Sequence, residues 1–148
     1  MRLAAARRRR QSGVGIIEIL VAVLVLSVGL LGLAGLQLRT LRNNQSALER
    51  GVAVTETHAV ADAMRADRIN AVENDAYDIA LTDAAPTGTT FADKVLAAWR
   101  NNLTASLGEG ATGSVDCDGA LCTIVIQWND ERGSGGEAEY EVTTEVQL

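Results

Sequence analysis

The chain has 148 residues, 47% of them hydrophobic, and a formal net charge of −6. Its charge is divided along the sequence: residues 1–13 hold five arginines and no acid, whereas residues 14–148 hold eight basic and all 19 acidic residues, a formal charge of −11. The excess of acidic residues in 14–148 argues against nucleic acid as a partner, because a protein binds nucleic acid through a basic surface.

An uncharged apolar segment follows the basic N-terminus. Residues 19–36 contain no charged side chain, and Leu38 extends the run past Gln37. A helix rises ~1.5 Å per residue, so about 20 such residues cover the ~30 Å hydrocarbon core of a bilayer. By the positive-inside rule, the arginines at 7–10 favour a cytoplasmic N-terminus. We therefore expect residues 14–38 to form a single membrane-spanning helix in the inner membrane, with the rest of the chain in the periplasm.

Three kinds of N-terminal segment compete for this pattern. An ordinary cleaved secretory signal needs a small-x-small site after the apolar region, and residues 34–37 (Ala-Gly-Leu-Gln) fit that requirement poorly. The lipoprotein form of such a cleaved signal needs a cysteine where Leu36 stands. A plain membrane anchor fits the length but leaves Glu18, a carboxylate beside lipid, without a purpose. A leader cut before the apolar segment gives a role to the arginines, to Gly13 and to Glu18.

Residues 13–18 (Gly-Val-Gly-Ile-Ile-Glu) resemble the cleavage motif of type IV prepilins, usually Gly followed by Phe-Thr-Leu-Ile-Glu. The resemblance implies that residues 1–13 form a prepilin leader, cut between Gly13 and Val14, and that the new N-terminus at Val14 is methylated. Glu18 then becomes the fifth residue of the mature chain, which the family pairs with the N-terminus of a neighbouring subunit. The sequence departs from the family at Val14, where Phe is commonest, and at the next position, where Thr is common.

Residues 24–37 are most similar to the PilV-like minor pilins. That resemblance implies a minor pilin that acts in type IV pilus assembly, in a priming or tip complex, and that is not an enzyme. The implied partners are prepilin peptidase, other minor pilins, the major pilin and the inner-membrane assembly platform. The sequence contains no nucleophile elbow, glycine-rich phosphate loop or metal cluster, so we expect no catalytic residue, cofactor or metal.

Two other functions stay open. A minor pseudopilin of type II secretion shares the leader and the type of head. A single-pass anchored periplasmic binding protein is the alternative from another class, with the acids near Asp116, Asp118 and Asp130 as a calcium site, although their spacing is not that of a known calcium loop.

Three glycines, Gly29, Gly32 and Gly35, recur at every third residue of the apolar segment. Glycine weakens a helix by ~1 kcal/mol relative to alanine, and small residues also allow membrane helices to approach closely. Major pilins often carry a proline in this region, which this segment lacks. The glycines therefore either soften the helix or ease its packing.

The helix is expected to continue, with amphipathic character, through residues 39–73, ending near Val72 and with Gly51 as a weak point. Its apolar side should lie against a sheet. His58 is the only histidine and has no second metal ligand nearby in the sequence. The positions predicted to face the sheet are Leu41, Leu48, Val52, Ala59, Ala63 and Met64.

Residues 74–148 are expected to form a periplasmic globular head. A polar loop, residues 73–90, precedes a second helix that Thr90 caps and Gly108 ends. Strands are predicted at 114–117, 122–128 and 138–146, the last with an apolar and a solvated side. A long helix packed on a small antiparallel sheet is an α+β, type IV pilin-like fold. The apolar side of the second helix is predicted to consist of Phe91, Val95, Leu96, Trp99, Leu103 and Leu107.

The two cysteines, Cys117 and Cys122, bracket four residues that include Asp-Gly. That spacing suits a hairpin with a bridge across its neck, and a head outside the cytoplasm is in an oxidising compartment. We expect a disulfide rather than free thiols, stabilising the head by only ~2 kcal/mol because the closed loop is short.

Overall fold

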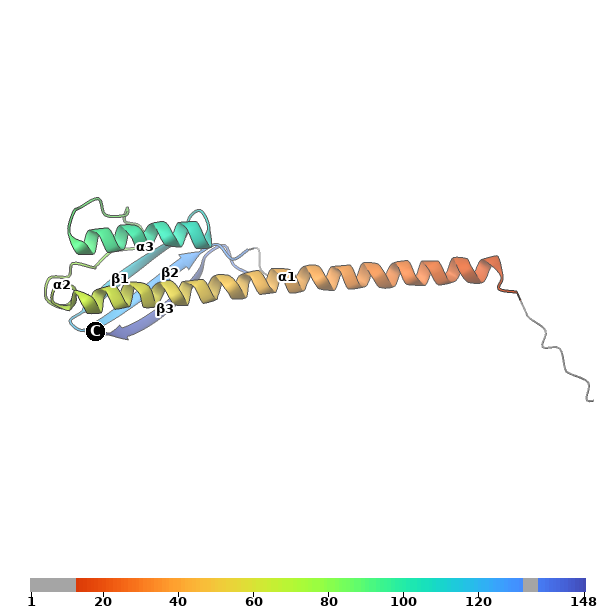
Figure 1. Ribbon diagram of the computed structural model, residues 1–148, viewed down its shortest axis with the longest axis horizontal. Helices are drawn as coiled ribbons and strands as arrows, with labels where there is room; N and C mark the ends of the chain where they lie inside the picture. The colour runs from red at the N-terminus through yellow and green to blue at the C-terminus, as the bar shows by residue number, and fades with distance from the viewer. Residues whose placement is uncertain (1–12, 132–135) are drawn as a thin grey trace, which may run out of the picture. The chain divides into compact units, whose positions relative to one another are not determined.

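The computed structural model describes residues 13–131 and 136–148; the predicted leader, apart from Gly13, lies outside the described residues. The chain divides into two compact units, Met1–Leu38 and Arg39–Leu148, and α1 contributes to both. The second unit contains an antiparallel sheet together with the helices (Figure 1). The elements are α1 (Ile16–Ala66), α2 (Arg68–Glu73), α3 (Phe91–Leu107), β1 (Thr112–Asp118), β2 (Leu121–Trp128) and β3 (Tyr140–Gln147). This is the α+β, type IV pilin-like architecture.

The first unit is the apolar part of α1. Its most apolar stretch of 18 residues has a mean hydropathy of 2.8, and none of that stretch is buried by the rest of the described chain. The Ser27 hydroxyl donates a hydrogen bond of 2.7 Å to the Val23 carbonyl, so this polar group is satisfied within the helix. A helix that is apolar on every side and uncovered requires lipid or other helices around it.

The part of α1 in the second unit buries a side that agrees only in part with the one predicted: Met64 is buried and Val52 packs against the core. Leu41 and Leu48 are 64% and 68% exposed, and Ala59 is also exposed. The buried side begins with polar residues because its contacts on the sheet side are polar: Ser46 bonds to Asp130, as described below. Apolar periodicity alone therefore predicted the buried side correctly at Val52 and Met64 but wrongly at the three exposed positions. The buried residues of α1 are Ser46, Glu49, Ala53, Thr57, Val60, Ala61 and Met64.

The predicted single helix to Val72 is interrupted at Asp67. The carboxylate of Asp67 accepts hydrogen bonds from the Asn70 amide at 2.7 Å and from the Tyr77 hydroxyl at 3.3 Å. A short acidic side chain that bonds to nearby groups competes with the helical backbone. As a result α1 ends at Ala66 and the six-residue α2 follows. Gly51, in contrast, lies within unbroken helix.

The sheet has the order β1-β2-β3, with both pairs antiparallel. Side chains alternate along β2 between buried and partly exposed, and β3 has the predicted apolar and solvated sides. Outside the main ladder, Ile79 of the loop after α2 pairs with Val115 of β1 through two backbone bonds of 2.9 and 3.0 Å. The sheet therefore receives one further bridge at its β1 edge.

Helix α3 begins and ends where the sequence predicts. Thr90 and Asp93 form a reciprocal capping box, and Gly108, with φ of 106°, follows the last turn. Trp99 is 3% exposed, but Phe91 is 55% exposed, so its predicted place in the core is wrong. Phe91 is the first residue of the helix, and the neighbouring Ala92 is buried in its place.

Candidate functional site

The predicted cleavage bond lies in non-helical backbone. Gly13, Val14 and Gly15 precede α1, which begins at Ile16, and Val14 is 67% exposed. A peptidase requires an accessible, locally extended bond, and exposed segments of small residues satisfy that requirement. The Gly13–Val14 bond therefore lies in exposed, non-helical backbone, and its cleavage stays a prediction.

Glu18 lies in the first turn of α1. Its backbone N–H donates to the Gly15 carbonyl at 3.0 Å, as does that of Ile19 at 3.3 Å, so the helix is already formed at this residue. Its side chain is exposed, and among residues 13–131 and 136–148 no basic group forms an ion pair with it. The positive end of the helix dipole favours a carboxylate here. Because a carboxylate is costly in lipid, a membrane around this helix would further favour pairing of Glu18 with a positive group from another molecule.

The structure thus places three predicted residues, Gly13, Val14 and Glu18, within six consecutive positions at the start of α1. Methylation and cleavage at Val14 and pairing through Glu18 stay predictions. Gly29, Gly32 and Gly35 lie in continuous helix, with open space around each among the described residues. The two interpretations of these glycines therefore both stay predictions.

Comparison with protein families finds the prokaryotic N-terminal methylation motif at residues 8–34. The match covers the cleavage junction, Glu18 and most of the apolar part of α1. The search of curated proteins and of solved structures found no match. Together with the fold, the motif supports the class of type IV pilins and pseudopilins, which are anchored by a single N-terminal helix. It implies processing by prepilin peptidase and assembly with pilus components.

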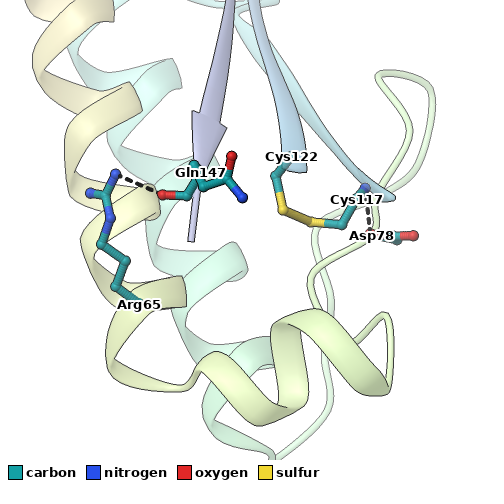
Figure 2. Close-up of a disulfide and its surroundings, with 5 residues drawn as sticks. All are labelled: Arg65, Asp78, Cys117, Cys122 and Gln147. Carbon is teal, nitrogen blue, oxygen red and sulfur yellow. Dashed lines mark hydrogen bonds between the residues drawn. A yellow bond between two sulfur atoms is a disulfide. The ribbon is translucent and has the colours of Figure 1, made fainter. Parts of the chain in front are cut away.

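In the head, Cys117 and Cys122 form a disulfide across the β1–β2 hairpin (Figure 2). The two residues are directly paired, with Cα atoms 4.0 Å apart, next to a two-residue loop in which Gly119 has φ of 61°. The Cys117 N–H donates to the Asp78 carboxylate at 3.2 Å, and Arg65 of α1 donates to the Gln147 carbonyl of β3 at 3.5 Å (Figure 2). The bridge therefore lies where the hairpin meets the loop after α2.

Asp130 is a buried carboxylate that the sequence did not identify as structural. It is 0% exposed and accepts hydrogen bonds from the Ser46 hydroxyl at 2.8 Å and from Arg50 at 3.1 Å. The Arg50 guanidinium also lies 4.3 Å from the ring centre of Tyr140, which contacts Trp128 edge-on. These contacts attach the segment after β2 to α1, and they engage one of the three acids of the calcium alternative.

Arg100 is the second buried charge that the sequence did not reveal. From α3 it donates to the carbonyls of Ala80 at 2.7 Å and Asp83 at 3.1 Å, and to the Thr112 hydroxyl at 2.6 Å. Burial lowers the pKa of Arg100, and the nearby Asp83 carboxylate partly offsets that effect. The guanidinium therefore holds the loop before α3 against α3 and β1.

Three acids, Asp78, Asp83 and Asp116, line an open recess of about 430 Å³ between the loop after α2 and β1. Burial is the main cause that raises the pKa of Asp78; the N–H of Cys117 opposes it, and Asp75 and Asp116 add to it. Among the described residues no cluster of three acids, histidines or cysteines has the geometry of a metal site. The calcium alternative therefore gains no support from this part of the chain.

Proposed function

We propose that the chain is a minor pilin that takes part in type IV pilus assembly after removal of residues 1–13. The single observation that carries this proposal is the methylation motif at 8–34, positioned so that Gly13–Val14 precedes α1 and Glu18 lies in its first turn. The cut generates an ammonium group at Val14, which is charged near neutral pH or below.

The proposed mechanism is pairing between that ammonium group and the Glu18 carboxylate of an adjacent subunit. In lipid each charge relieves the desolvation of the other, so the pair forms only where both are brought together. The pair fixes the axial stagger of neighbouring helices. The apolar surface of residues 19–38 then packs against other subunits, and the heads, in the periplasm, dock on related minor pilins, with a place in the priming or tip complex.

The same motif also fits a minor pseudopilin of type II secretion, because the two groups share the leader and helix. Neighbouring genes distinguish them: a cluster of pilus minor-pilin genes supports the proposal, and a secretion operon supports the pseudopilin.

Replacement of the glutamate tests the mechanism. We expect Glu18→Gln to reduce incorporation into membrane assemblies and surface fibres by roughly tenfold, because an ammonium group is then left unpaired in lipid. Glu18→Asp, which retains the charge, serves as the matched control and should be incorporated into fibres more efficiently than Glu18→Gln. Immunoblots of sheared fibres give the measurement, and full incorporation of Glu18→Gln contradicts the proposed pairing.

A further inference from the structure

A groove lies between α1 and α3 on the surface of the head. From α1, Glu56, Ala59 and Val60 line it, and Trp99 of α3 is buried beneath it. Its volume is about 180 Å³, enough for one branched aliphatic side chain. Ala59 and Ala98 are both exposed on its rim, and two alanines at one helix–helix contact leave the space that larger side chains would fill.

Glu56 supplies the one acidic group in the lining of this groove. Burial raises the pKa of Glu56, and among the described residues no basic group forms an ion pair with it. A partly buried carboxylate without a positive neighbour favours an incoming cation. The groove therefore suits an occupant that presents an aliphatic side chain next to a basic one.

The chain carries such a pair on another part of the same unit. Ile69 of α2 is 68% exposed, and the adjacent Arg68 is exposed and forms no ion pair among the described residues. The unit Arg39–Leu148 contains 18 acidic and eight basic residues, so most approaches between two copies bring like charges together. The Arg68–Ile69 corner, defined by these two side chains, is an exception to that repulsion.

We propose that the Arg68–Ile69 corner of one copy docks in the α1–α3 groove of a second copy. Ile69 fills the recess between Ala59 and Ala98, and the Arg68 guanidinium meets the Glu56 carboxylate. Because corner and groove are different surfaces of one subunit, the contact is heterologous, and the pair retains one free groove on the first copy and one free corner on the second. Association of this type is open-ended, as in a fibre. The contact depends on the head alone and does not require the leader to be removed.

Charge-reversal substitutions combined with photocrosslinking test this contact, in two differently tagged full-length copies in the membrane. A photocrosslinking residue placed at Asn102, on the groove rim, should link the two copies. We expect Glu56→Arg or Arg68→Glu in both copies to reduce linked dimers about tenfold. When one copy carries Glu56→Arg and the other Arg68→Glu, the charges are opposite in both directions of docking between the two copies, and linked dimers should recover to at least about half of the original yield.

Leu48→Asp is the matched control, because Leu48 is also an exposed apolar residue but lines neither the groove nor the recess beside the corner. It should leave the yield unchanged, whereas Ile69→Asp should reduce it. Crosslinks only to a different protein, equal loss with Leu48→Asp, or no recovery in the exchanged pair would each overturn the contact. Intact mass of the same samples shows whether residues 1–13 have been removed, and so tests the proposed function independently of the contact between heads.

Discussion

At the scale of single residues, buried polar side chains in the head connect segments of the chain through hydrogen bonds. Asp130 and Arg100 each join segments that are distant in the sequence, and Tyr77 is fully buried with its hydroxyl on Asp67. Removing one member of a buried polar set leaves the others desolvated and unsatisfied. Two of these residues yield specific predictions.

Replacing Asp130 by alanine should lower the free energy of unfolding by about 1–2 kcal/mol, because the buried Ser46 hydroxyl loses its acceptor and the half-exposed Arg50 guanidinium loses its ion-pair partner. Asp62→Ala is the matched control, since Asp62 forms an exposed pair with Arg65 at 2.7 Å and should cost under about 0.5 kcal/mol. Urea unfolding of the chain in detergent, followed by tryptophan fluorescence, measures both. Equal effects of the two substitutions would refute the assigned role of Asp130.

Tyr77 should make the head less stable at high pH. Burial, the charge of Asp67 and the hydrogen bond to Asp67 together raise the pKa of Tyr77 to about 12. An unfolded tyrosine loses its proton near pH 10. Between about pH 10 and 12 the unfolded chain therefore holds fewer protons, and rising pH favours unfolding by up to about 2–3 kcal/mol.

Comparison with Tyr77→Phe isolates this effect. The difference in unfolding free energy between wild type and the variant should be constant below about pH 10 and should shift in favour of the variant above it. A constant difference up to pH 12 would show that Tyr77 titrates normally in the folded protein.

At the scale of the elements, two glycines illustrate opposite constraints. A Cβ atom at Gly113 of β1 would collide with the ring of Trp99, so the strand and α3 can approach this closely only without a side chain there. Gly51 of α1 is exposed, with open space around its Cβ position among the described residues. The same substitution should therefore have opposite effects at the two positions.

We expect Gly113→Ala to destabilise the head by about 1–3 kcal/mol through overpacking against Trp99. Gly51→Ala should instead stabilise it by about 0.5–1 kcal/mol, because alanine has the higher helix propensity. Thermal unfolding of both variants and of the wild type measures these two opposite changes in stability. Destabilisation by Gly51→Ala would show that α1 needs the glycine there for a bend.

The elements that the sequence predicted correctly are those with local signals. Thr90 and Gly108 bound α3 through capping chemistry, and β3 alternates with a period of two. The polar beginning of the buried side of α1 could not be predicted in this way, because it depends on a contact between Ser46 and Asp130, 84 residues apart. Phe91 was misplaced for the same reason: apolar character predicts burial only where a neighbour covers the side chain.

At the scale of the whole molecule, the methylation motif was predictable because it consists of consecutive residues, so that neither it nor the apolar run after it depends on tertiary contacts. The roles of Gly13, Val14 and Glu18 within this motif stay predictions. The α1–α3 groove and the Arg68–Ile69 corner could not be predicted, since each combines exposure with a neighbour that only the fold supplies.

The most direct test of the central claim, that this chain is a processed pilin-class subunit, is the intact mass of the protein isolated from membranes that contain prepilin peptidase. Our account predicts a chain that lacks residues 1–13 and carries one additional methyl group on the amine of Val14. A chain that retains residues 1–13 in functional assemblies would contradict it and would favour a plain membrane anchor.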